Sequence, residues 1–234
     1  MTHTTPPTTN SSSTPSTPAA PPAPDLTAYR IVHRALRRGA DRVAVACAAL
    51  VDRPDPRRSA ALQRWYRGYL AELHSHHDIE DQILFPAVAA RAPVMHEHET
   101  RVEVEHQMLI ECMHQLEREL GQAADRPRDD GALRAAAATS EDLSVLMRAH
   151  LDYEDTHIIP VISEALTGPE FDELERQARQ HGSLSTMAFA LPFIIESADP
   201  DEVDHLLAVA GAPLVVLLRL TRGRYARRTA AAFG

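Results

Sequence analysis

The chain carries one sequence pattern twice, His-x-x-x-Glu-Asp-x-x-x-x-Pro, first from His76 to Pro86 and again from His150 to Pro160. In an α-helix, residues four apart lie about 40° apart around the axis and about 6 Å apart along it, so each histidine and its glutamate share a face. Imidazoles and carboxylates are ligands of transition metals. Two such faces turned toward each other are expected to form a pocket that can hold a dinuclear metal centre.

Helices must position these side chains, and the composition favours an all-α fold. Aromatic residues make up only 5% of the chain, its 9 glycines are scattered, and no segment alternates like a half-buried strand. Helix breakers separate four long helical segments, at about residues 26–51, 57–91, 94–124 and 132–166. Because short loops force neighbouring helices to be antiparallel, we predict an up-down-up-down four-helix bundle. Pro86 and Pro160 should kink or loosen helices two and four one to two turns beyond their glutamates.

The predicted bundle occupies residues 25–168, between two segments of different character. Residues 1–24 are Thr, Ser and Pro with almost no large apolar residue, which predicts a disordered tail. Residues 169–234 predict a helical C-terminal extension with an apolar run from Leu206 to Leu220 and a basic end. At roughly 15 residues this run is too short for a membrane span, which needs about 20. Either the extension packs on the bundle, or its basic end makes a peripheral membrane or protein contact.

Charge and residue usage exclude several classes of function. The net charge of −9 argues against nucleic-acid binding. All 24 basic residues are arginine, which excludes Schiff-base chemistry and a phosphate-binding loop that needs its lysine. Cys47 and Cys112 lie in helical patterns and are expected to be buried and reduced, with a redox-active pair as the alternative. The N-terminal segment lacks the features of a signal peptide, so a cytoplasmic protein is expected.

Histidines on the other two helices are placed to complete a metal centre. His33 shares an apolar stripe of helix one, and His106 is followed by apolar residues of helix three. On helix two, His77 lies about 100° from His76 around the axis, so Glu80 falls between the two imidazoles. A carboxylate in that position can bridge two metals while each neighbouring histidine binds one.

In combination these residues resemble the hemerythrin-like (HHE cation-binding) family. The resemblance spans about residues 25–168 and rests on His33, His76-His77-x-x-Glu80-Asp81-x-x-Leu84-Phe85-Pro86, His106 and His150-x-x-x-Glu154-Asp155. It implies two Fe ions in a non-haem di-iron centre, oxo- or hydroxo-bridged, inside the bundle. The metal ligands it implies are His33, His76, His77, Glu80, His106, His150 and Glu154. Helix three departs from the oxygen-carrying members, which have two histidines four residues apart there, and His77 is the natural substitute.

A count of ligands predicts one open coordination position. Two octahedral irons offer about twelve positions, of which five histidines, two bridging glutamates and a bridging oxygen fill about eleven. We expect the open position on the iron held by His33 and His76, because the other three histidines saturate the second iron. Asp81 and Asp155 are expected to orient metal-bound imidazoles, although Asp155 could ligate if its helix is distorted.

Three functions fit such a centre. The leading hypothesis is a protein that binds or senses O2, NO or peroxide at the open iron position. The second is a di-iron redox enzyme with catalase-like or peroxidase-like activity. The histidine-rich ligand set favours this enzyme less than reversible ligand binding, because ferritin-like oxidases use carboxylate-rich sites. The third is a metal-dependent regulatory or interaction module. Manganese and zinc are alternatives to iron on sequence alone.

Overall fold

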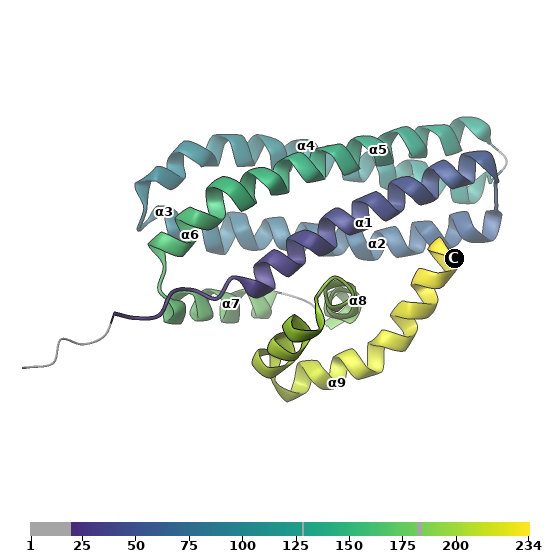
Figure 1. Ribbon diagram of the computed structural model, residues 1–234. Helices are drawn as coiled ribbons and strands as arrows, with labels where there is room; N and C mark the ends of the chain where they lie inside the picture. The colour runs from purple at the N-terminus through teal and green to yellow at the C-terminus, as the bar shows by residue number, and fades with distance from the viewer. Residues whose placement is uncertain (1–19, 128, 182–183) are drawn as a thin grey trace, which may run out of the picture.

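The computed structural model describes residues 20–127, 129–181 and 184–234, and within these ranges the fold is all-α. Four long bundle helices run antiparallel to their neighbours (Figure 1). They are α1 (Thr27–Asp52), α2 (Pro56–Ile79) continued by α3 (Phe85–Ala89), α4 (His96–Asp125), and α5 (Asp130–Tyr153) continued by α6 (Ile159–Ala165). Each packs against the next in chain order, and α1 closes the bundle by packing on α5. The predicted four-helix bundle is confirmed.

Local sequence signals account for where these helices begin. The Asp55 side chain accepts hydrogen bonds from two backbone N–H groups at the start of α2, and Asp129 does the same for α5. Such caps satisfy donors that the first turn leaves without intrahelical partners. The third bundle helix is preceded by a short 3-10 turn, η2 (Pro93–Met95), so its regular part begins slightly later than the sequence predicts.

A π-helical segment interrupts the second and the fourth bundle helix. These segments are η1 (Glu80–Leu84) and η3 (Glu154–Ile158), and in each the residue that follows donates its N–H to the glutamate carbonyl five positions back. A proline follows one residue later, where its missing N–H removes the normal four-residue hydrogen bond. The sequence predicted that the prolines loosen these helices one to two turns beyond their glutamates, and the predicted position was wrong. The loosening begins at the glutamates themselves, because the π segment widens the turn before each proline.

The core of the bundle consists of two apolar regions separated by a polar layer. The larger region is centred on the fully buried Trp65, Tyr66 and Tyr69, and the smaller one contains Phe85 and Ile158. Along every bundle helix the predicted metal ligands lie where the two regions meet, and His150 directly precedes Leu151 of the larger region. Apolar side chains therefore shield the polar layer from water on both sides.

The C-terminal extension packs on one side of the bundle, mainly against α2 (Figure 1). It consists of α7 (Gly168–His181), α8 (Leu184–Ile195) and α9 (Pro200–Phe233). α9 bends at Gly211, whose φ of 73° lies in the region that glycine favours. Its far end returns to α2, where the Trp65 indole donates a hydrogen bond to the Thr229 hydroxyl at 3.1 Å. None of the described helices is long and apolar enough to cross a membrane.

The chain before α1 is described from residue 20 onward. Of the segment 1–24 predicted to be disordered, residues 1–19 lie outside the described residues. The Pro22 carbonyl accepts a hydrogen bond from the Gly168 N–H at 2.7 Å, which ties the chain before α1 to the start of α7.

Both cysteines are free thiols. Burial raises the pKa of Cys47 to about 12 and that of Cys112 to about 11, so both are protonated at neutral pH.

Candidate metal centre

Seven side chains from the four bundle helices converge in the polar layer. They form two groups, in each of which one possible ligand atom per residue lies within 4.8 Å of the others. The three-histidine group is His77, His106 and His150, and the mixed group is His33, His76, Glu80 and Glu154. All seven are buried. The structure thus brings together the same seven residues that the sequence singled out, and it places the adjacent His76 and His77 in different groups.

Glu80 directs one carboxylate oxygen to each group. Its Oε1 lies 3.2 Å from His76 Nε2, and its Oε2 lies 3.6 Å from His106 Nε2. Two ligand atoms at right angles on one metal, with bonds of about 2.1 Å, lie about 3 Å apart. The separations on both sides of Glu80 are therefore close to those that a bridging carboxylate requires.

Glu154 repeats this arrangement from the opposite bundle helix. Its Oε2 lies 3.5 Å from His33 Nε2 and its Oε1 lies 3.4 Å from His150 Nε2. Each glutamate is the first residue of a π segment, so the two halves of the centre have the same backbone geometry. Both carboxylates can bridge the same two positions.

Most atoms that face the two groups have no hydrogen-bond partner among the described residues. They are Nε2 of His33, His76, His106 and His150, both ring nitrogens of His77, Oε2 of Glu80 and both carboxylate oxygens of Glu154. A buried polar atom without a hydrogen bond typically costs about 1–3 kcal/mol, and a buried carboxylate more. Such a concentration of unsatisfied ligand atoms fits a site that binds cations.

Two aspartates orient imidazoles from outside the groups. Asp81 Oδ1 lies 3.0 Å from His106 Nδ1, and Asp155 Oδ1 lies 2.8 Å from His33 Nδ1. Asp155 also accepts a hydrogen bond from Arg37 at 2.6 Å. An Nδ1–H that donates to a carboxylate leaves Nε2 deprotonated and directed toward the group. Although the helix is distorted at Asp155, this side chain faces His33 and not the interior of the mixed group.

Glu105, which the sequence analysis did not single out, has the same role for the histidine of the fourth bundle helix. Its Oε2 lies 3.1 Å from His150 Nδ1, and its Oε1 accepts a hydrogen bond from Arg101 at 2.7 Å. Glu105 directly precedes His106 in the chain, so it points toward the neighbouring helix when His106 points inward. The position of Glu105 next to the predicted ligand His106 is the sequence signal that could have identified it.

Tyr29 is a second residue that the sequence analysis missed. Its hydroxyl donates a hydrogen bond to Glu80 Oε1 at 2.5 Å, and its ring centroid lies 4.4 Å from that of His33. Burial, together with the carboxylates of Glu80 and Glu154, raises the pKa of Tyr29 well above its usual value. Tyr29 precedes His33 by four residues and so shares its helical face, which is the spacing that could have identified it.

The electrostatics of the protein groups favour neutral imidazoles on the second bundle helix. Burial and the neighbouring imidazoles lower the pKa values of His76 and His77 well below the usual value. Burial and the charge of Glu154 raise the pKa of Glu80. Burial opposes ionisation of Glu154, but nearby histidines outweigh it and the pKa of this carboxyl is lowered. Neutral imidazoles are the form that binds metals, and a cation would remove the repulsion between the two carboxylates.

The hemerythrin HHE cation-binding domain model matches residues 26–162, which is more than half of the chain. The chain belongs to this family. Comparison with curated proteins and with solved structures finds no match. The matched range contains all seven residues of the two groups and ends before α7, so the C-terminal extension lies outside the hemerythrin domain.

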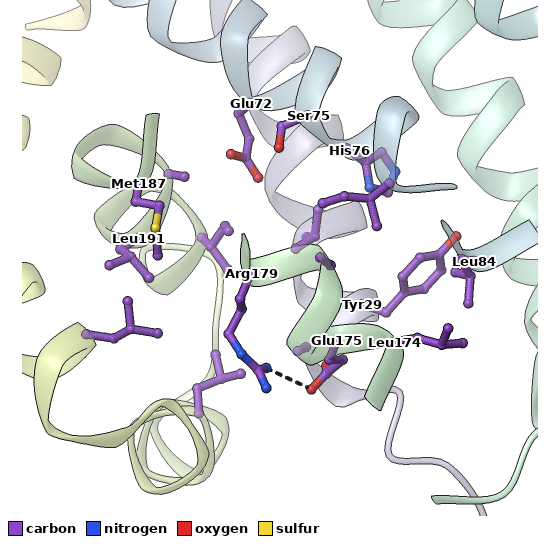
Figure 2. Close-up of a pocket in the computed structure, with 18 of the residues that line it drawn as sticks. Tyr29, Glu72, Ser75, His76, Leu84, Leu174, Glu175, Arg179, Met187 and Leu191 are labelled. Atoms are coloured by element: carbon purple, nitrogen blue, oxygen red, sulfur yellow. Dashed lines mark hydrogen bonds and ion pairs between the residues drawn. The ribbon is translucent and has the colours of Figure 1, made fainter. Parts of the chain in front are cut away.

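A cavity of about 330 Å³ lies between the hemerythrin domain and the extension (Figure 2). Tyr29, His76 and Glu80 form part of its wall on the side of the hemerythrin domain, and Met187 and Leu191 of α8 line the opposite side. No residue of the three-histidine group lines it. The cavity therefore borders the mixed group alone.

Proposed function

We propose that the chain holds a non-haem di-iron centre that binds O2, NO or peroxide at the iron of the mixed group. The seven residues fit two irons because they supply a mixed nitrogen and oxygen donor set, and most of its atoms have no hydrogen-bond partner among the described residues. When bound, iron would supply redox chemistry and a coordination position that a small molecule can occupy. Manganese and zinc are the competing metals.

The observation that carries this proposal is the asymmetry of the two groups. Three histidines belong to one group, whereas the other has only His33 and His76 beside the shared glutamates. His76 also lines the cavity, and no residue of the three-histidine group does. The metal with fewer protein ligands is thus the one that a small molecule can approach.

The surrounding residues hold this half of the centre in place. Asp155 and Arg37 fix the imidazole of His33, and Tyr29 donates to the Glu80 oxygen that faces His76. The mostly aliphatic cavity wall lowers the polarity of the surroundings on this side of the group. These contacts favour a defined ligand position over rapid exchange with solvent.

Tyr29 specifically favours a second candidate, an enzyme with catalase-like or peroxidase-like activity. Its raised pKa keeps the phenol protonated, and its hydroxyl lies at the edge of the mixed group. It can donate a hydrogen bond to a substrate oxygen there and so stabilise charge that develops on it. Under this hypothesis Tyr29→Phe lowers the rate of peroxide consumption about tenfold or more while iron content is kept. An unchanged rate, or no turnover in the wild type, would exclude it.

The test of the leading proposal is metal content combined with the absorption spectrum. We expect about two irons per chain and an iron charge-transfer band that shifts on addition of azide or peroxide. His77→Ala should lower the iron content, whereas His74→Ala, a change on the same helix outside both groups, should keep it. Iron content well below two per chain in the wild type, with no ligand-sensitive band, would refute the proposal.

A further inference from the structure

The cavity has the composition of a site for an organic ligand, which is more than a small gas needs. Its volume of about 330 Å³ lies within the range of pockets that bind organic molecules. Its walls are mostly aliphatic side chains from α1, α2, α7, α8 and α9, with Leu174, Met187 and Leu191 among them (Figure 2). Because three of these helices belong to the extension, the cavity exists only where the extension covers the hemerythrin domain.

Among the described residues that line this cavity, Glu72 is the one buried acidic residue that belongs to neither metal group. Its side chain is 8% exposed, and it has no hydrogen bond or ion pair among the described residues. It precedes His76 by one helical turn on α2 and lines the same cavity (Figure 2). Because this carboxyl faces an apolar cavity without a protein partner, a hydrogen-bonding group bound in the cavity would stabilise it.

The other charged residues of the wall already have partners. Arg179 donates a hydrogen bond to Glu175 on the same helix at 3.3 Å. Their side chains are 45% and 25% exposed, which places this pair at the solvent side of the cavity. A ligand inside the cavity therefore finds a carboxyl without a protein partner at Glu72, with the Ser75 hydroxyl beside it, and mostly apolar contacts elsewhere.

We propose that this cavity binds an elongated apolar molecule with a single hydroxyl group, which donates a hydrogen bond to Glu72. The carboxyl can accept this bond in either protonation state. The apolar part lies among the aliphatic residues of α7, α8 and α9, beside Tyr29 and His76. This site goes beyond the binding of a diatomic ligand or peroxide and does not depend on it, because every wall is formed by the protein itself.

The first experiment measures binding of 1-hexanol to the full chain by displacement of the apolar fluorophore N-phenyl-1-naphthylamine, with and without iron. We expect saturable displacement in both preparations. Leu191→Trp and, from another helix, Leu174→Trp should each weaken binding at least tenfold by filling the cavity. Val45→Trp, at a 71% exposed position of α1, is the matched control and should leave binding unchanged. Melting temperatures establish that each variant is folded.

The second experiment tests the role of Glu72. 1-Chlorohexane has the same chain but no hydroxyl, so the wild type should bind it about tenfold more weakly than 1-hexanol. In Glu72→Leu the preference for 1-hexanol should be lost. Absence of saturable displacement, full binding in both tryptophan variants, or an unchanged preference for 1-hexanol in Glu72→Leu would each overturn the proposal. Because the measurement is repeated without iron, its outcome is independent of whether the di-iron proposal holds.

Discussion

Replacing Asp155 by asparagine should weaken metal binding in the mixed group and leave the three-histidine group nearly intact. Asp155 Oδ1 lies 2.8 Å from His33 Nδ1, and His33 is the only residue of either group that it contacts in the described structure. An asparagine keeps the shape and the acceptor oxygen but removes the negative charge that makes the imidazole a stronger ligand. The corresponding change on the other side of the centre is Asp81→Asn, which acts on His106.

The structure sets the expected size of each effect. Loss of an orienting carboxylate typically lowers metal affinity about 10- to 100-fold, or about 1.4 to 2.7 kcal/mol. The Asp155 side chain is 30% exposed and the Asp81 side chain 51% exposed, so water screens the second pair more strongly. Arg37 also fixes the position of Asp155. We therefore expect a loss near the upper end of the range for Asp155→Asn and near the lower end for Asp81→Asn.

The assay is a metal titration against a chelator of known affinity, analysed for two binding steps. Asp152→Asn is the matched control, because Asp152 accepts a hydrogen bond from the same Arg37 but is 73% exposed and does not contact His33. The control should bind metal as the wild type does. Equal losses in Asp155→Asn and Asp152→Asn, or equal losses of both binding steps in Asp155→Asn, would refute the reasoning.

Three further predictions concern the extension and the cavity. A Cβ on Gly68 would lie 2.5 Å from the Phe189 ring, so Gly68→Ala should displace α8 and lower the free energy of unfolding by about 1–3 kcal/mol in urea titrations. Thr229→Val removes the partner of the buried Trp65 indole and should cost about 1–3 kcal/mol, whereas an unchanged value would show that α9 is not held there. Burial raises the pKa of Glu72 from 4.5 to about 7. The folded state therefore has its full stability below about pH 4.5, where this carboxyl is protonated whether the chain is folded or unfolded, and loses stability as the pH rises through about 7 and the buried carboxyl ionises. Glu72→Gln should therefore be more stable than the wild type by about 3 kcal/mol at pH 8 and show no gain at pH 4.5, and equal stabilities at pH 8 would contradict this.

The sequence predicted the bundle from helical periodicity and the breakers between helices, and it predicted the clustering of the seven residues from that periodicity together with the resemblance to the hemerythrin-like family. The spacing of His76 and Glu80 places them on one face of a helix whatever the tertiary structure, and the short loops between helices favour antiparallel neighbours. Two contacts were missed because they depend on how helices pack. Glu105 contacts His150 across the interface between α4 and α5, and Tyr29 contacts Glu80 across the interface between α1 and the second bundle helix.

The sequence patterns also could not predict where the π segments begin. The prolines showed that the regular helix must fail, but not on which residue the wider turn begins. In the structure it begins at Glu80 and Glu154, and the aspartates that follow them contact histidines of other helices. The packing of the extension was left between two alternatives, because an apolar run shows that a helix needs a partner surface without showing which one.

The repeated His-x-x-x-Glu-Asp pattern forms two halves that are alike in backbone and different in surroundings. In each half the glutamate faces both groups and the aspartate contacts a histidine of another bundle helix. His77 has its counterpart at Leu151, which is fully buried in the apolar core, so one group gains a third histidine that the other lacks. Tyr29 and the cavity both lie on the side of the group with two histidines. The group with fewer histidines is therefore also the one that lies beside Tyr29 and the cavity. Under the proposed function, metals bound in the two groups would differ both in their ligands, through His77, and in their access, through the extension.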